Sequence, residues 1–145
     1  MANLRDDFIG LVRFETALWN DVERSVRSIP HTASLARHGI LELADTDAGV
    51  RIQDIVDSLV ITVGGASRLI DRMESDGLVE RRSDPDDRRS SRIFLTTAGR
   101  TALTATNPAI DTALREVLGP NAAAHLAAIA AVIERADAER AEARG

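Results

Sequence analysis

The sequence predicts a mainly α-helical fold that contains one small β-hairpin. Apolar residues recur at spacings of three and four along much of the 145-residue chain, which is the period of an amphipathic helix. Two short helical patterns, 53–59 and 63–75, are separated by a brief turn, as in a helix-turn-helix. A strand-like segment, a polar loop and a second strand-like segment follow over residues 78–96.

Two helices are expected before the helix-turn-helix. Residues 4–27 carry apolar side chains on one stripe, and Glu15 falls on the same stripe. Pro30 ends this segment, because proline lacks the amide hydrogen that a helix needs. A second helix is expected from about Thr32 to Ala44, followed by a turn over Asp45–Gly49.

The helix-turn-helix itself is bounded by recognisable start and stop residues. Val50–Ile52 is expected to pair briefly as a strand, and Gln53–Leu59 forms the first short helix. Thr62 is predicted to cap the second helix, Val63–Ser75, because its hydroxyl can accept a hydrogen bond from an amide of the first turn. Gly77 then stops that helix, since glycine readily adopts the left-handed conformation.

The β-hairpin carries a cluster of arginines. Its strands are expected at Leu78–Arg82 and Arg92–Thr96, and its loop, Ser83–Ser91, is rich in residues that favour turns. Five arginines lie in the twelve residues from Arg81 to Arg92. Arginine binds phosphate through two parallel hydrogen bonds and suits a narrow minor groove, so we interpret the hairpin as a wing that grips DNA.

Two further helices are expected after the hairpin. The first begins at Thr96 or Thr97 and runs toward Leu118, where a Gly-Pro pair breaks the chain. Asn121 can cap the last helix. Residues 134–145 are highly charged, and we expect them to be frayed helix or disordered.

The composition narrows the possible functions. The chain has no cysteine, which excludes disulfides, zinc–thiolate sites and thiol redox switches, and all 18 basic side chains are arginine. The net charge is −5, but residues 51–100 hold nine arginines and nine acidic residues, so the acidic excess lies elsewhere. The sequence contains no run of 18 apolar residues and no signal-peptide pattern, so we expect the protein to reside in the cytoplasm.

The sequence shows no pattern for catalysis or for a cofactor. It contains no nucleophile elbow and no glycine-rich phosphate loop. His31 and His38 would lie about 10.5 Å apart along a helix, too far to share one metal ion, and His125 is distant in sequence. We therefore expect neither an enzyme nor a metal or cofactor site.

The segment from Leu69 to Arg100 closely resembles the MarR family of bacterial regulators. The family pattern has a recognition helix ending in D-R-L-E-x-x-G-L-V, a wing with D-x-D-D-R-R and a strand ending in L-T-x-x-G. This chain has D-R-M-E-S-D-G-L-V, D-P-D-D-R-R and L-T-T-A-G at the same places. The resemblance implies a winged helix-turn-helix at 46–100, with dimerisation and scaffold helices at 1–45 and C-terminal dimerisation helices with a charged tail at 101–145.

The resemblance also implies a function. It predicts a homodimeric transcription regulator that binds a pseudo-palindromic operator in double-stranded DNA, with half-sites about 10 bp apart. The expected regulator is a repressor that a small aromatic or phenolic ligand releases from DNA. The alternative is a winged-helix module that binds another protein, which the net charge favours and the intact D-D-R-R wing opposes.

By position, the resemblance assigns DNA contacts to the wing and to the recognition helix. Arg88 corresponds to the wing-tip arginine that enters the minor groove, and Asp86 to the carboxylate that orients it. Arg89 and Arg92 would contact phosphates or buttress the hairpin. The predicted contacts on the recognition helix are Thr62, Gly64, Gly65, Ser67, Arg68 and Arg72.

The recognition helix departs from many family members at its start. Gly64 and Gly65 stand where relatives carry hydroxyl or bulkier side chains, so we expect Ser67 and Arg68 to carry more of the direct base readout. The alternative for the helix arginines is ion pairing with acidic residues on the same helix.

Three residues are candidates for ligand binding. His38 falls where the family often has an aromatic residue, although a partly buried, hydrogen-bonded histidine is the competing interpretation. Glu15 could instead form an ion pair across a dimer interface, and Trp19 could be part of the core.

Overall fold

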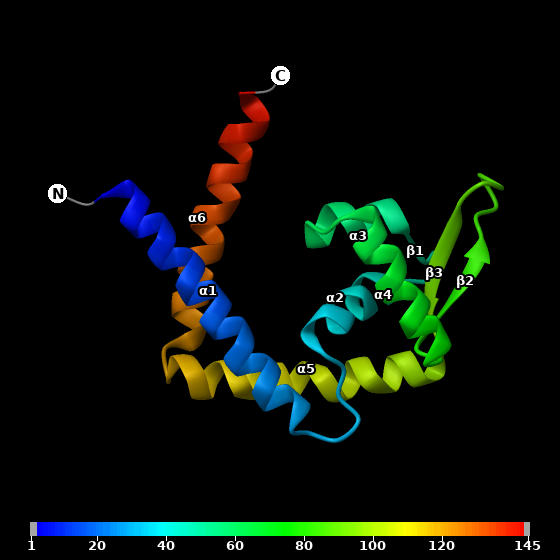
Figure 1. Ribbon diagram of the computed structural model, residues 1–145, viewed down its shortest axis with the longest axis horizontal. Helices are drawn as coiled ribbons and strands as arrows, with labels where there is room; N and C mark the ends of the chain where they lie inside the picture. The colour runs from blue at the N-terminus through cyan, green and yellow to red at the C-terminus, as the bar shows by residue number, and fades with distance from the viewer. Residues whose placement is uncertain (1–2, 144–145) are drawn as a thin grey trace. The chain divides into compact units, whose positions relative to one another are not determined.

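The computed structural model describes residues 3–143 (Figure 1). It divides into two compact units, one formed by Glu23–Ile110 and the other by the chain before and after that segment. Helices α1, Leu4–Arg27, and α5, Thr97–Leu118, each run through a boundary between the units. Among the described residues, no single helix is long and apolar enough to cross a membrane. Helix α5 and the helix that follows it, α6 (Ala122–Glu142), pass that test only together, across a 97° bend.

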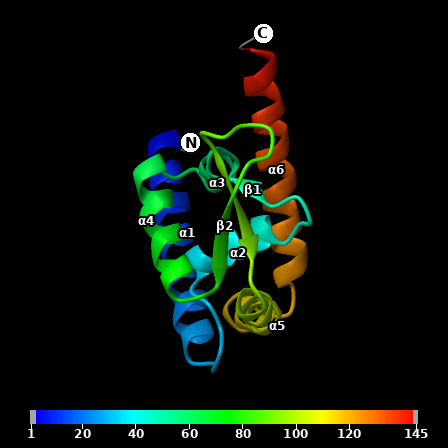
Figure 2. The same cartoon turned by 90° about the vertical axis from the view of Figure 1, so that its right-hand side faces the viewer.

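The unit Glu23–Ile110 is a winged helix-turn-helix. Its elements between α1 and α5 are α2 (Leu35–Ala44), β1 (Val50–Arg51), α3 (Ile52–Leu59), α4 (Val63–Ser75), β2 (Val79–Ser83) and β3 (Ser91–Leu95). The antiparallel sheet has the order β1-β3-β2. In Figure 2 the hairpin faces the viewer and α4 lies beside β2. The predicted fold class is confirmed, and of the predicted strand Val50–Ile52 the first two residues pair with β3, while Ile52 is the first residue of α3.

The core of this unit includes α2. Ile40 and Leu41 of α2 are fully buried, together with Ile55, Ile70 and Ile93 of the helix-turn-helix and the sheet. Because α2 and the start of α5 supply part of this core, the compact unit is longer than the 46–100 range assigned to DNA binding from the sequence.

The start of α2 differs from the sequence prediction. The helix begins at Leu35, three residues after Thr32, and its cap is Ser34, whose hydroxyl accepts a hydrogen bond from the Arg37 amide. The Thr32 hydroxyl instead donates to the carbonyls of Val26 and Ile29, at 2.8 and 2.9 Å. Thr32 therefore closes the turn after α1 and does not cap α2.

The predicted ends of α4 are confirmed. The Thr62 hydroxyl accepts a hydrogen bond from the Gly65 amide at 3.0 Å. After Ser75 the chain reaches Gly77, whose φ of +75° is left-handed, and the Leu78 amide donates back to the Met73 carbonyl at 2.9 Å. This arrangement satisfies carbonyls that would otherwise lack partners at the helix end.

The L-T-x-x-G segment joins the hairpin to α5 and to the end of α4. The Thr96 hydroxyl accepts from the Gly99 amide at 3.0 Å, which caps α5, and donates to the Gly77 carbonyl at 2.5 Å. A Cβ atom at Gly99 would lie 2.0 Å from the Leu78 carbonyl oxygen. Only glycine therefore allows α5 to approach this backbone so closely.

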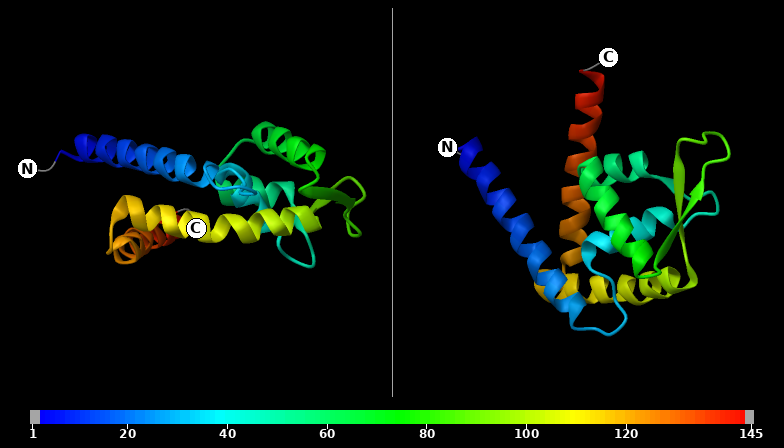
Figure 3. Two further views of the ribbon diagram at one scale, coloured as in Figure 1. Left: turned by 90° about the horizontal axis from the view of Figure 1, so that it is seen from below. Right: turned by 45° about the vertical axis from the view of Figure 1, so that its right-hand side comes forward.

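The other unit contains most of α1, the end of α5 and α6, Ala122–Glu142. Helix α6 begins directly after Asn121, as predicted, although the Asn121 side chain makes no capping hydrogen bond. Of the two alternatives expected after residue 134, frayed helix and disorder, the described residues have helix, because α6 is helical as far as Glu142 (Figure 3). The large apolar side chains exposed on α1 and α6 are Leu4, Phe8, Ile9, Leu11, Val12, Phe14, Trp19, Ile129, Val132 and Ile133.

Candidate nucleic-acid interface

Helix α4 presents two arginines without internal partners. Arg68 and Arg72 are exposed, and no hydrogen bond or ion pair joins either guanidinium to another residue in the described range 3–143. The acids that could have neutralised them, Asp71 and Glu74, bind Arg81 instead, at 2.6 and 2.8 Å. The positive charge of Arg68 and Arg72 therefore remains available to an external partner.

Arg81 has a structural role that the sequence did not suggest. It lies on β2, and its two terminal nitrogens bind carboxylates of α4. A guanidinium that holds two carboxylates at once fixes the hairpin against the recognition helix. Arg81 thus positions the wing, although it belongs to the arginine cluster that was interpreted as gripping DNA.

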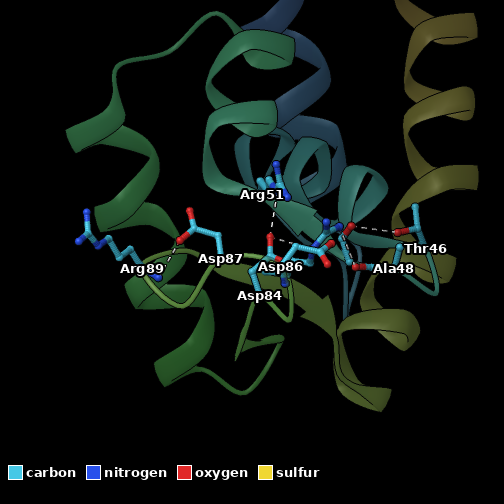
Figure 4. A network of polar contacts seen from close by, with 9 residues as sticks. Thr46, Ala48, Arg51, Asp84, Asp86, Asp87 and Arg89 are labelled. Carbon is cyan, nitrogen blue, oxygen red and sulfur yellow. Dashed lines mark hydrogen bonds and ion pairs between the residues drawn. The ribbon is translucent and has the colours of Figure 1, made fainter.

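A buried carboxylate, Asp84, organises the base of the wing loop (Figure 4). Only 1% of this residue is exposed. One of its oxygens, Oδ2, lies 2.9 Å from Arg51 Nε and 3.2 Å from Arg92 Nε, and the other accepts a hydrogen bond from the Asp86 amide at 3.0 Å. The Asp86 amide, and then Arg51 and Arg92, hold the pKa of Asp84 below its ordinary value, against the opposing effect of burial.

The strand register explains why this carboxylate is needed. Arg92 on β3 is opposite Arg51 on β1 and opposite Arg82 on β2, so three arginines form one row across the sheet. Like charges at opposed positions are destabilising. Asp84 neutralises two of them, while Arg82 pairs with Glu80 and lies 4.4 Å from the Phe94 ring centroid.

The wing loop is held by backbone hydrogen bonds while its arginines point outward. The Asp84 amide donates to the Ser90 carbonyl at 3.1 Å, and the Asp87 carboxylate accepts from the Arg89 amide at 3.0 Å. Arg88 and Arg89 are exposed, and their guanidiniums have no hydrogen bond or ion pair within the described part of the chain. The loop projects beyond the helices of its own unit (Figures 1 and 3).

The structure gives different roles to two predicted wing residues, Asp86 and Arg92. Asp86 makes no hydrogen bond to Arg88 among the described residues, and its amide supports Asp84 instead. Arg92 takes the buttressing position, because it pairs with Asp84 and donates to the Ala48 carbonyl at 3.3 Å. The residues that sequence reasoning missed are Arg51, Arg81 and Asp84. Once the strand register is known, the opposition of Arg51 and Arg92 indicates that a carboxylate such as Asp84 must lie between them.

The other predicted contacts lie on the first two turns of α4. Thr62 and Gly64 are exposed, Gly65 and Ser67 are half-buried, and the Thr62 hydroxyl is occupied as the helix cap. A Cβ atom at Gly64 would meet nothing within 4 Å, so this surface is open.

The ligand candidates are divided between the two units. Glu15 and Trp19 line a shallow hollow on α1 together with Thr16. His38 lies in the winged unit, where its Nε2 is 2.6 Å from Asn107 Oδ1 and 3.7 Å from a Glu42 oxygen. His38 therefore has the hydrogen-bonded environment of the competing interpretation.

The fold and the exposed arginines define the class of protein. A helix-turn-helix followed by a hairpin, with cationic side chains on the second helix and on the hairpin loop, is the architecture of a winged-helix nucleic-acid-binding domain. Residues 34–91 match the family described as the MarR family. Together with the relatives below, this match places the winged-helix segment in the MarR family.

Three relatives illustrate the similarity. YkoM of Bacillus subtilis (strain 168), described as an uncharacterized HTH-type transcriptional regulator, is 32% identical over 87 residues, which are 59% of this chain and 56% of YkoM. This chain thus matches little more than half the length of that relative. A MarR-family transcriptional regulator from Rhodococcus sp. RHA1 has a TM-score of 0.79 at 23% identity, covering 92% of this chain and 94% of the other.

A third relative is a transcriptional repressor named CouR. Its complex with a 23-mer DNA duplex has a TM-score of 0.73 at 28% identity, covering 86% of this chain and 89% of that CouR chain. The structure of CouR from Rhodococcus jostii RHA1 bound to p-coumaroyl-CoA has a TM-score of 0.76 at 22% identity, covering 92% of this chain and 94% of the other.

Proposed function

We propose that this protein is a dimeric, sequence-specific DNA-binding transcription regulator that acts as a repressor. One observation carries the proposal. Of the nine arginines between residues 51 and 100, five are paired with acidic residues of the described chain. The four without such partners are Arg68, Arg72, Arg88 and Arg89, which all lie on α4 or in the wing loop.

This distribution matches two modes of DNA contact. Helix α4 would enter the major groove, where Arg68 and Arg72 can reach base edges or phosphates. The wing loop would follow the backbone, and Arg88 would enter the adjacent minor groove, whose narrow regions attract guanidinium groups. The complex of CouR with a DNA duplex supports DNA binding by a related fold.

A salt titration tests whether the protein binds DNA through these arginines. Each neutralised phosphate contributes a slope of about −0.9 to the log–log dependence of affinity on salt. The affinity of the protein for the DNA upstream of its own gene should therefore fall steeply between about 50 and 200 mM salt. A winged-helix module that binds another protein would show no such salt-sensitive DNA complex.

A single substitution tests the assignment of the wing. Arg88→Ala should weaken operator binding by at least about 1 kcal/mol, while dimerisation and thermal unfolding stay unchanged. Arg115→Ala is the matched control, because Arg115 is an exposed arginine on α5 outside the winged unit. Equal affinity of the Arg88→Ala and wild-type proteins would show that Arg88 does not contact DNA.

We further propose that a small aromatic or phenolic ligand releases the protein from DNA. CouR, which binds p-coumaroyl-CoA, provides a precedent within the family. Glu15, Trp19 and His38 are the candidate ligand residues. A panel of phenolic acids, added to a preformed DNA complex, should include compounds that dissociate it, and Trp19 fluorescence should report their binding.

A further inference from the structure

The start of α4 is apolar, although the proposed function places this end of the helix in the major groove. Val63, the first residue of α4, is 55% exposed, and Val60 in the preceding turn is 89% exposed. Gly64 and Gly65 carry no side chains, and Ala66 is buried. Within residues 63–66, Val63 is therefore the side chain that the helix start offers to a partner.

The backbone at Val60 is unusual for a β-branched residue. Its φ and ψ of 52° and 48° are left-handed, a conformation that glycine adopts without strain and valine rarely adopts. Because the side chain is almost wholly exposed, it has no buried packing to offset this strain. The Val60 amide donates to the Val56 carbonyl, so this left-handed conformation ends α3 in the turn just before α4.

Resting on the proposed function, we infer that Val63, with Val60 in the adjoining turn, recognises thymine methyl groups in the operator. The base edges in the major groove present hydrogen-bond donors and acceptors, and the thymine C5-methyl is the apolar group among them. Valine methyl groups complement that group and cannot hydrogen-bond to the donors and acceptors of the other base edges.

The neighbouring residues make such a contact possible. Methyl groups must approach within about 4 Å to bury each other. Gly64 leaves open space next to Val63, so no side chain at position 64 holds the helix start away from the bases. Further along α4, the exposed Arg68 and Arg72 supply positive charge that complements the phosphates. Base readout therefore begins at Val63, before the Ser67 and Arg68 positions expected from the sequence.

The first arm of the test selects binding sites from a pool of random DNA duplexes. The wild-type protein should enrich sites with thymine at a fixed position in each half-site. Val63→Ala should lose the preference at that position and keep the others. Ile29→Ala is the matched control, since Ile29 is an exposed β-branched residue in the turn after α1, and it should select the wild-type sites.

The second arm replaces that thymine with uracil, which lacks the methyl group. Wild-type affinity should fall about fourfold, the effect of leaving one methyl group unburied. Val63→Ala should bind the thymine and uracil duplexes equally. A uracil effect of the same size in both proteins would overturn the inference, because the methyl would then contact another residue.

Two further outcomes are distinguishable. Enriched sites without a thymine dependence on Val63 would overturn the inference and leave the proposed function intact. A protein that enriches no site would overturn both. If Val63→Ala alters the oligomeric state in sedimentation while the uracil effect persists, Val63 belongs to a protein interface and the inference is wrong.

Discussion

At the base of the wing, one carboxylate compensates two arginines that the sheet register brings together. Arg51 and Arg92 are opposed across β1 and β3, and Asp84 binds both. Removing the carboxylate leaves two guanidiniums facing each other, so the wing loop should lose its anchor even though its tip is unchanged.

The lowered pKa of Asp84 predicts a pH dependence of stability. A carboxyl whose pKa is lower in the folded than in the unfolded protein stabilises the fold above its ordinary value of 3.8, and this stabilisation is lost as the pH falls through the folded-state pKa. Asp84→Asn should lower the free energy of unfolding at pH 7 and reduce its decline on acidification below about pH 5.

Urea denaturation of the wild-type and Asp84→Asn proteins across this pH range provides the measurement. Asp86→Asn is the control, because Asp86 supports the loop through its amide and its exposed side chain makes no hydrogen bond to a described residue. Parallel pH profiles for the wild-type and Asp84→Asn proteins would contradict the proposed role of the charge.

Val60 predicts a stabilising substitution. Its left-handed backbone costs an L-amino acid roughly 1–2 kcal/mol, and glycine avoids that cost while losing some of the gain to backbone entropy. Val60→Gly should therefore raise the free energy of unfolding by about 0.5–1 kcal/mol. Val60→Ala keeps the Cβ atom and should not give this gain in the same denaturation experiment.

At the scale of elements, the junction of α4, β2 and α5 depends on a close backbone approach. Gly99→Ala places a methyl group against the Leu78 carbonyl and should lower the free energy of unfolding by roughly 1–3 kcal/mol. Gly64→Ala is the matched control, since open space surrounds Gly64 and alanine favours helices; stability should stay equal or rise by up to about 1 kcal/mol. Equal melting of the Gly99→Ala and wild-type proteins would refute this packing argument.

The ion pairs of Arg81 with Asp71 and Glu74 predict that Arg81 affects the affinity for DNA without contacting DNA. Arg81→Gln leaves Asp71 and Glu74 unneutralised on α4, close in sequence to Arg68 and Arg72. The loss of one positive charge, worth about 0.5 kcal/mol through water, should weaken DNA binding roughly twofold at low salt. Because these ion pairs are partly exposed, stability should fall by less than about 1 kcal/mol.

Charge neutralisation provides the control for Arg81. The triple variant D71N/E74Q/R81Q removes the acids as well as the arginine, so by charge alone it should regain at least the affinity lost by Arg81→Gln. Fluorescence anisotropy with one fixed duplex compares the proteins. Failure of the triple variant to recover would show that Arg81 acts by positioning the wing or by contacting DNA, and not through the charges of Asp71 and Glu74.

The elements that the sequence predicted well are those whose ends are set by neighbouring side chains. Thr62 and Gly77 define α4 within a few residues of its ends, and Thr96 does the same for the start of α5. The start of α2 could not be predicted, because Thr32 and Ser34 are both good caps and tertiary contacts decide between them.

The candidate site was predictable in its location but not in its internal order. The D-D-R-R loop and the arginines of α4 follow directly from the sequence. The role of Asp84 depends on Arg51, 33 residues earlier in the chain, so it appears only when the strand register is known. For the same reason Arg81 could not be separated from the DNA-facing arginines, since its partners lie seven and ten residues before it.

At the scale of the whole molecule, the exposed apolar side chains of α1 and α6 require an explanation. Phe8 is 64% exposed, and further large apolar residues follow it along α1. Such continuous apolar surface is uncommon on monomeric proteins and marks an interaction site. A second copy of the chain would cover these helices and place two winged units on one duplex, as the proposed operator symmetry requires.

If the protein is such a dimer, one substitution far from α4 should change its affinity for a duplex with two half-sites and leave its affinity for a single half-site unchanged. Phe8→Ser should yield monomers by sedimentation equilibrium, and Arg13→Ser, an exposed polar position on the same helix, should remain dimeric. A monomer has one winged unit, so the second half-site must be bound by a separate molecule. Affinity for a duplex with two half-sites should therefore fall roughly 100-fold or more, while affinity for a single half-site stays unchanged. A Phe8→Ser protein that is still dimeric would exclude this face of α1 from the interface, and a monomer with undiminished affinity for both duplexes would show that each winged unit binds independently.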